Sequence, residues 1–126
     1  MAIVSGPDFL ALQVRDMERS RRFYVEQLGL KTAPQSPPNA VVFQTAPIPF
    51  AIREPTVDLE AVPRLGWGVA LWLACDDADA LAASLEEANV TLTQPPQDGP
   101  FGRQFSFADP DGYILTVHQA AGQGGR

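Results

Sequence analysis

The chain has 126 residues, 45% of them hydrophobic, and a formal net charge of −6. This length and hydrophobic content are typical of one small domain with a core of its own. No apolar run approaches the ~20 residues of a membrane-spanning helix, and no basic cluster outside Arg19, Arg21 and Arg22 could serve nucleic acid. The single Cys75 excludes an internal disulfide, and no leader-like segment is apparent, so a cytoplasmic location is expected.

The first half predicts one strand, one helix and three shorter strands. Residues 9–14 alternate so that Phe9 and Gln13 share one face of a strand. Asp16 is the predicted N-cap of a helix that ends near Gly29. The inner face of this helix is predicted to consist of Met17, Ser20, Tyr24 and Leu28. The shorter strands are predicted at residues 30–33, 40–45 and 50–54.

The same order recurs in the second half. A strand at residues 69–75 precedes a helix capped by Asp77, and this helix ends at Asn89, a residue that tolerates a positive φ. Its inner face is predicted to consist of Ala78, Leu81, Leu85 and Ala88. Further strands are predicted at residues 91–93, 104–108 and 113–119. The repeat indicates an α+β fold of two βαβββ modules, which form a curved mixed sheet with the helices on its outer face.

These modules, at about 8–55 and 67–119, are predicted to form a single domain over residues 1–120, with residues 121–126 as a flexible tail. The segment 55–67 between them is too apolar for a free tether, so a packed connection is expected. Proline-rich loops are predicted at residues 35–39 and 94–100.

The Asp109-Pro110-Asp111-Gly112 sequence predicts a tight turn between the last two strands. Pro110 fixes its own φ, the aspartate side chains can bond nearby backbone amides, and Gly112 can adopt the left-handed conformation. The aromatic stretch from Phe101 to Phe107 leads into this turn.

Two segments carry a family resemblance: residues 8–30, from the first strand to Leu28-Gly29-Leu30, and residues 100–112, which end in the turn. Together they resemble the opening and closing signatures of the vicinal oxygen chelate superfamily, which includes glyoxalase I, extradiol dioxygenases, fosfomycin-resistance enzymes and bleomycin-resistance binding proteins. The resemblance implies a ligand trough on the inner sheet face and a homodimer, in which modules pair within a chain or exchange between chains.

Metal-dependent members of that superfamily place four ligands in the trough. The corresponding positions here are Phe9, Ala51, Ala70 and Thr116, and none offers a good donor to a divalent ion. The resemblance therefore implies neither a bound metal nor another cofactor.

The pattern of the closing segment is nearest to that of the bleomycin-resistance proteins, with Phe101 where those proteins carry a stacking tryptophan. Trp72 has small neighbours on its strand face, so the two rings are predicted to form the sides of an aromatic clamp. The candidate ligand-binding residues are Phe9, Gln13, Arg53, Trp72, Phe101, Thr116 and His118.

Several of these residues also have a purely structural interpretation. Trp72 suits a core as well as a pocket, Phe9 could plug the trough, and Arg53 suits the surface as well as a ligand carboxylate. His118 could form a hydrogen bond in the trough, act as a general base, or lie at a strand edge.

Two functions follow from this resemblance. The first is a metal-free binding protein that sequesters an aromatic or planar small molecule, an antibiotic being one candidate. The alternative is a lyase or dioxygenase-like enzyme, with displaced metal ligands or with a metal-free mechanism that uses His118, Arg53 or Tyr113.

Overall fold

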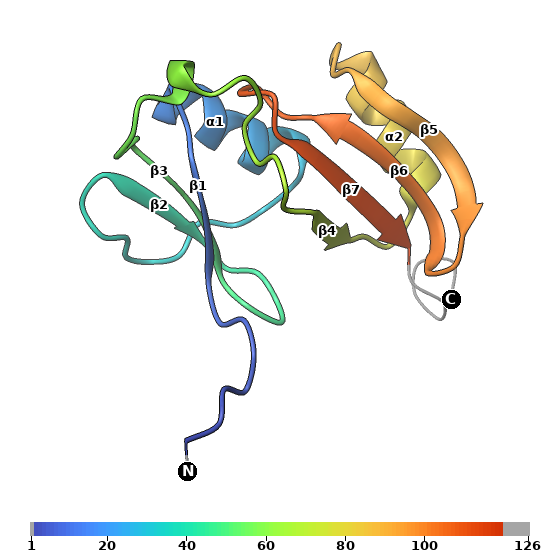
Figure 1. The fold of residues 1–126 in the computed structure, drawn as a ribbon. Coiled ribbons are helices and arrows are strands. Elements are labelled where there is room, and N and C mark those ends of the chain that lie inside the picture. Colours follow the sequence, from blue (N-terminus) through green and yellow to red (C-terminus); the bar gives the residue numbers. More distant parts are fainter. Residues whose placement is uncertain (1, 120–126) are drawn as a thin grey trace. The chain divides into compact units, whose positions relative to one another are not determined.

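A computed structural model describes residues 2–119, so the predicted tail at 121–126 lies outside the described residues. The chain divides into two compact units between Leu59 and Glu60, inside the predicted connection. Figure 1 shows the elements in chain order. The predicted α+β class is confirmed, and the modules follow the βαβββ plan, completely in the second unit and with one strand fewer in the first. That the two units form one domain stays a prediction.

The first unit contains a three-stranded sheet in the order β1-β3-β2. Strands β1 (Leu10–Gln13) and β3 (Phe50–Arg53) are parallel, and β2 (Ala40–Phe43) is antiparallel to β3. The strand predicted at residues 30–33 is reduced to a single bridge between Thr32 and Phe43. This module therefore has one strand fewer than expected, although the Ala33 amide donates to the Val42 carbonyl oxygen and the Gln44 amide to the Lys31 carbonyl oxygen, both at 2.8 Å.

Helix α1 (Met17–Arg22) begins as predicted, since the side chain of Asp16 accepts a hydrogen bond from the Arg19 amide at 3.0 Å. It continues as a π-helical segment (Phe23–Gln27), and Gly29 follows with φ of +75°. The wider turn places Phe23 beside Tyr24 in the core, which the regular helical spacing did not predict.

An aromatic core holds this unit together. The Tyr24 ring lies 5.8 Å from that of Phe43 and 5.3 Å from that of Phe50, between ring centroids, and the two phenylalanine rings are stacked at 5.7 Å. All three side chains are buried. Such contacts add about 0.5–1.5 kcal/mol per ring pair to the gain from burial.

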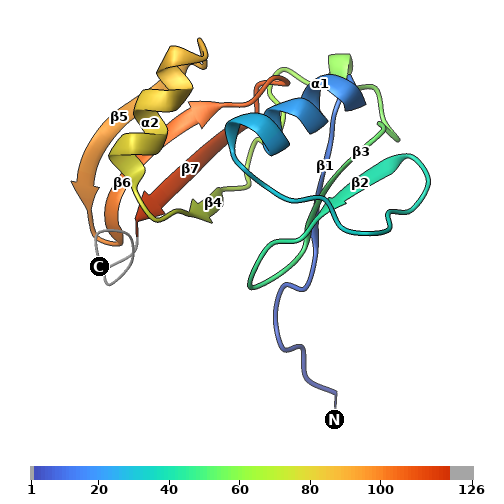
Figure 2. The same ribbon diagram turned by 180° about the vertical axis from the view of Figure 1, so that it is seen from behind.

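The second unit contains a curved four-stranded sheet in the order β4-β7-β6-β5, which helix α2 (Ala78–Glu87) covers on one face (Figure 2). Strand β4 (Leu71–Ala74) is parallel to β7 (Ile114–Gln119). Strand β6 (Gly102–Ala108) is antiparallel both to β7 and to β5 (Leu92–Gly99).

Local signals in the second unit are largely confirmed. Asp77 caps α2 by accepting a hydrogen bond from the Ala80 amide at 3.1 Å, and Asn89 ends the helix with φ of +65°. Ala82 is buried and Ala88 is exposed, so the inner face of α2 differs from the prediction at that turn. The helix ends before residue 88 could reach the sheet.

The Asp-Pro-Asp-Gly turn forms as predicted. The Oδ1 atom of Asp109 accepts hydrogen bonds from the amides of Asp111 at 2.9 Å and Tyr113 at 3.0 Å. Gly112 has φ of +95°, in the left-handed region that glycine adopts without strain. This turn sets the register of β6 against β7.

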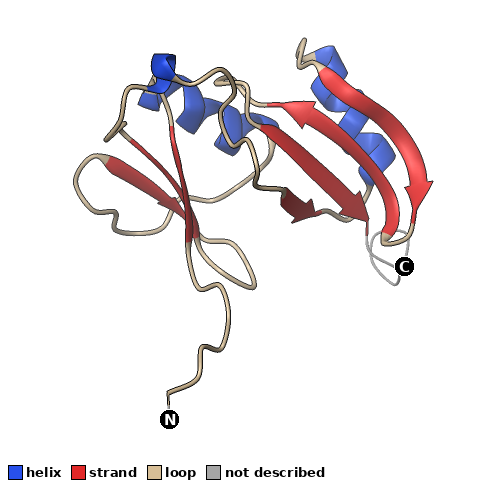
Figure 3. Ribbon diagram, viewed as in Figure 1, coloured by secondary structure: helices blue, strands red, loops and turns tan. Residues whose placement is uncertain are grey.

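The predicted loop at residues 94–100 is wrong. Strand β5 runs through Pro95 and Pro96 as far as Gly99 and curves along β6 (Figure 3). Its register shifts twice, before Gln94 and before Gln97. Proline is tolerated here because β5 is an edge strand, where an outward-facing residue needs no amide donor.

The connection between the units is only partly packed. Leu59 is buried and begins a short 3-10 helix (Leu59–Ala61), whereas Val57 and Val62 are exposed. Trp67, at the end of this connection, is 72% exposed. Among the described residues, no helix has both the length and the apolar character that crossing a membrane requires.

Candidate ligand-binding face

The second sheet has two chemically different faces. The face toward α2 is apolar, and Phe105, Phe107, Leu115 and Val117 are all buried there. The opposite face, here named the helix-free face, carries two rows of side chains that run across the strands in register. The first row is Trp72, Thr116, Ser106 and Gln94. The second row is Ala74, His118, Gln104 and Gln97.

Three rings gather at one end of the helix-free face. Trp72 meets His118 at 5.7 Å and Phe101 at 5.9 Å between ring centroids, both edge to face. Phe101 lies in the two-residue turn between β5 and β6, and its carbonyl oxygen is 3.1 Å from Nδ1 of His118. Trp72 is 41% exposed and Phe101 63% exposed, so this aromatic cluster presents ring surface to solvent.

The arrangement of Trp72 and Phe101 differs from the predicted clamp. The rings of Trp72 and Phe101 touch each other at an interplanar angle of 88°, so they leave no parallel gap for a planar molecule. The hydrogen bond to His118 holds the turn over the sheet in this position. A planar ligand would instead stack on the exposed ring faces.

A polar pair lies beside the cluster. The hydroxyl groups of Ser106 and Thr116 are 2.9 Å apart and share a hydrogen bond. Ser106 is only 5% exposed although it lies on the helix-free face. Beside the cluster, the floor of this face therefore contains a neutral pair of hydroxyl groups that satisfy each other.

Gln104 is the unusual member of the second row. Its Oε1 atom is buried and has no hydrogen-bond partner within residues 2–119. The side chain folds over Gly99, where a Cβ atom would overlap the amide group. Glycine at position 99 thus provides the space that this side chain occupies.

The structure brings together four of the seven predicted site residues: Trp72, Phe101, Thr116 and His118. The other three belong to the first unit. Phe9 is exposed just before β1.

Gln13 and Arg53 are register partners on β1 and β3. Gln13 accepts a hydrogen bond from the Thr56 amide at 2.8 Å, and Nε of Arg53 donates to the Glu54 carbonyl oxygen at 3.0 Å. Both side chains therefore bind backbone groups of residues 54–56 in this structure.

Gln104 and Ser106 were not among the predicted site residues. Both alternate with Phe105 and Phe107 along β6. This period-2 pattern in the sequence indicates one apolar and one polar face of the strand. Their significance depends on the neighbouring strands, which supply Thr116 and His118 opposite them.

The positions that the family resemblance assigns to metal ligands do not fit a metal ion. Phe9, Ala51 and Ala70 have no donor atom in their side chains, and the Thr116 hydroxyl is already paired with Ser106. Among residues 2–119, no group of three or more His, Cys, Asp or Glu side chains is arranged to hold a metal.

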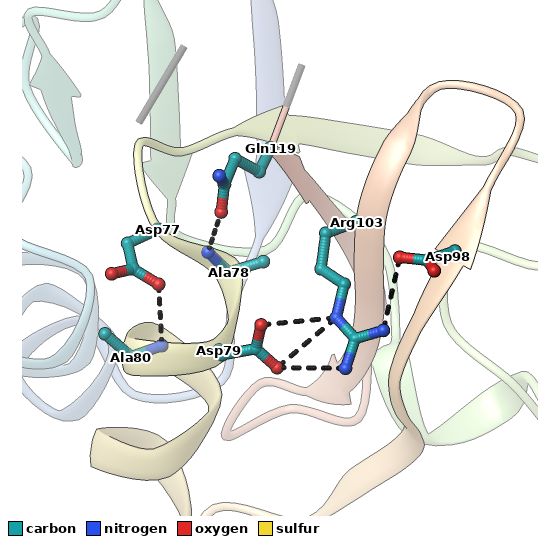
Figure 4. Close-up of polar contacts among 7 residues, drawn as sticks. All are labelled: Asp77, Ala78, Asp79, Ala80, Asp98, Arg103 and Gln119. Atoms are coloured by element: carbon teal, nitrogen blue, oxygen red, sulfur yellow. Dashed lines mark hydrogen bonds and ion pairs between the residues drawn. The ribbon is translucent and has the colours of Figure 1, made fainter. Parts of the chain in front are cut away.

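Arg103 on β6 forms two ion pairs, one of them with helix α2 (Figure 4). Arg103 contacts Asp79 on α2, with Nε to Oδ2 at 3.2 Å, and Asp98 on β5 at 3.3 Å. The hydrogen bond to Asp79 is the main reason that the pKa of Arg103 is raised. Gln119 accepts a hydrogen bond from the Ala78 amide at 2.8 Å. These contacts fasten α2 to the sheet.

Two similar α+β modules, the second with an aromatic and polar sheet face opposite its helix, define the fold class of this protein. The chain belongs to the Glyoxalase/Bleomycin resistance protein/Dioxygenase superfamily, whose family model matches residues 6–117. No curated protein sequence matches the chain at a significant level.

Similar solved structures include two proteins of Streptomyces sp. CB03234. TnmS3, an antibiotic-binding protein, is 27% identical with a TM-score of 0.71, and the match covers 96% of this chain and all of TnmS3. A glyoxalase/bleomycin resistance protein is 29% identical with a TM-score of 0.69, covering 90% of this chain and all of the other.

A lactoylglutathione lyase of Agrobacterium tumefaciens is 21% identical with a TM-score of 0.66, covering 91% of this chain and 93% of the lyase. At that identity the similarity establishes the fold alone.

Proposed function

We propose that this protein binds a planar aromatic compound on the helix-free face of its second sheet, and that it does so without a metal ion. The observation that carries the proposal is the aromatic cluster of Trp72, Phe101 and His118, which leaves ring surface exposed at the end of a polar sheet face. Stacking on such rings contributes about 0.5–1.5 kcal/mol per ring pair beyond the area buried.

The polar groups of the helix-free face favour an uncharged ligand. Its two rows contain hydroxyl, amide and imidazole groups but no carboxylate, ammonium or guanidinium group. A charged ligand would lose its hydration there without gaining a counter-ion from the face. Neutral planar compounds with polar substituents therefore fit the site best.

The similarity to TnmS3 supports an antibiotic as the ligand class, because that protein is an antibiotic-binding protein. The replacement of metal ligands by Phe9, Ala51, Ala70 and Thr116 supports sequestration rather than metal-assisted catalysis. We extend this proposal to a cytoplasmic homodimer, since the edges of both sheets would gain from a partner that prevents uncontrolled strand pairing.

A titration with dihydroxynaphthalene tests the binding function. In a Trp67→Phe background, Trp72 is the sole tryptophan, so its fluorescence reports directly on the aromatic cluster. We expect saturable quenching and a rise in melting temperature, equivalent to about 2.7 kcal/mol at a hundred times the dissociation constant. The matched control is the saturated decalin diol, which has the same carbon skeleton but is not planar. Equal binding of both compounds, or of neither, would refute the proposal.

Metal independence and assembly have separate tests. Elemental analysis of protein purified without chelator should find less than stoichiometric zinc, iron, manganese or nickel. One equivalent of any of them per chain would favour the enzyme alternative. Light scattering should give twice the chain mass, and a monomer at high micromolar concentration would contradict the dimer.

A further inference from the structure

The hydrogen bond between His118 and Phe101 determines what the rest of the imidazole can do. A backbone carbonyl oxygen can only accept, so Nδ1 of His118 must donate to it across the 3.1 Å contact. In the neutral ring Nε2 is then an acceptor. Nε2 has no hydrogen-bond partner within residues 2–119. The second row therefore contains a hydrogen-bond acceptor to which no described protein group donates.

Gln104 adds a second acceptor beside it. Gln104 and His118 are direct register partners on β6 and β7, where side chains of a pair lie within about 5.5 Å at Cβ. The Oε1 atom of Gln104 is buried without a partner, a costly arrangement that a ligand donor would relieve. Ala74, next to His118 on β4, has a small side chain that leaves space over this row.

We propose that His118 and Gln104 make the site selective for planar aromatic compounds that carry hydrogen-bond donors, such as phenolic hydroxyl groups. This inference rests on the proposed function and specifies its ligand class. The rings of the aromatic cluster hold the planar skeleton, and Nε2 of His118 accepts from one hydroxyl. Gln104 turns away from Gly99 and accepts from a second. Aromatic compounds that offer only acceptors leave both groups unpaired.

Three probes of one skeleton test the selectivity: dihydroxynaphthalene, dimethoxynaphthalene and naphthalene. The diol and its ether differ in their donors, and naphthalene shows whether the methyl groups of the ether are too bulky. We expect the wild-type protein to bind the diol about tenfold more tightly than either other probe.

His118→Asn should abolish this preference, because the asparagine amide can still donate to the Phe101 carbonyl but offers no group at the place of Nε2. The affinity for naphthalene should fall less than the affinity for the diol. Gln104→Leu should reduce the preference in the same way while filling a similar volume.

Gly99→Ala tests the role of Gln104 by a route that leaves its amide intact. Gly99 does not have a positive φ, so alanine there acts through the space that Gln104 occupies and not through backbone strain. Because alanine displaces the Gln104 amide toward the ligand, the variant should bind the diol more tightly than wild type. The same change in the Gln104→Leu background should leave the diol affinity unaltered.

The outcomes separate the two proposals. Equal affinity of wild type for the three probes would overturn the selectivity and leave the binding function in place. Selectivity that survives both His118→Asn and Gln104→Leu would also overturn it. Failure of all three probes to bind would refute the proposed function and this inference together.

Discussion

The side-chain oxygens of Thr116 on β7 and Ser106 on β6 lie 2.9 Å apart and share a hydrogen bond. The family resemblance implies that Thr116 corresponds to a carboxylate ligand of the metal-dependent members of the superfamily. Its hydroxyl is engaged with Ser106 of the neighbouring strand β6, beside the aromatic cluster. On the helix-free face, these two hydroxyl groups thus bind each other across strands β6 and β7.

This pair predicts an asymmetric double-mutant cycle. Thr116→Val should lower the free energy of unfolding by about 1–3 kcal/mol, because it leaves the buried Ser106 hydroxyl without its partner. Ser106→Ala should cost less, since Thr116 is only half-buried and water can replace the lost bond. The double variant should cost less than the sum of the two. Urea unfolding measures all three, and strict additivity would show that the hydroxyl groups do not interact.

Phe101→Ala should weaken binding of a planar aromatic ligand by about tenfold or more while changing stability little, because Phe101 is exposed in a turn. The matched control is Trp67→Ala, which removes another exposed ring, one outside the cluster, and should leave affinity unchanged. Fluorescence titration and thermal unfolding give the two readouts. A loss of stability as large as that of Phe105→Ala, expected at about 3–5 kcal/mol, would identify Phe101 as a packing residue.

Asp79→Asn should lower the melting temperature more than Asp98→Asn. Arg103 reaches Asp79 through both Nε and Nη2, whereas Asp98 is almost fully exposed and receives only Nη1. The difference should shrink as salt is added, since exposed ion pairs are screened. In an Arg103→Gln background the two substitutions should lower the melting temperature by similar amounts. A difference that persists there would place the effect of Asp79 in the first turn of α2 rather than in the ion pair.

Burial raises the pKa of the Cys75 thiol, and this makes stability depend on alkaline pH. The unfolded thiol ionises from about pH 8.5 while the folded thiol stays neutral, so the stabilisation is complete below that pH and is lost as the pH rises through the folded pKa. Urea midpoints measured on both sides of pH 8.5 should show this decline. The urea midpoint of the Cys75→Ala variant should decline less steeply with pH. Rapid labelling of the folded thiol near pH 8.5 would contradict the raised pKa.

The local elements of this protein were predictable because their causes are local. Asp16 and Asp77 cap helices through contacts three residues away, and Asn89 ends α2 by adopting a positive φ. Asp109 builds the final turn with amides two and four residues further on. Each of these depends on a few neighbouring residues, so the sequence alone determined it.

The predicted strand pattern failed where the position in the sheet mattered. Proline at positions 95 and 96 indicated a loop, but β5 lies at the sheet edge, where a missing amide donor costs little. The segment around Thr32 has a strand-like sequence, yet it forms only one bridge. No local pattern states which strand is central and which is at the edge.

In the candidate site, too, some features follow from the local sequence and others from the tertiary structure. Alternation along single strands determined which side chains share a face, and this suggested Trp72, Thr116 and His118 in advance. Only the parallel pairing of β4 with β7 placed Trp72 against His118, and only the β5–β6 turn brought the Phe101 carbonyl to the imidazole. The unpaired oxygen of Gln104 over Gly99 likewise depends on two strands at once. These contacts join residues far apart in the chain, so their geometry was decided by the tertiary structure and not by the local sequence.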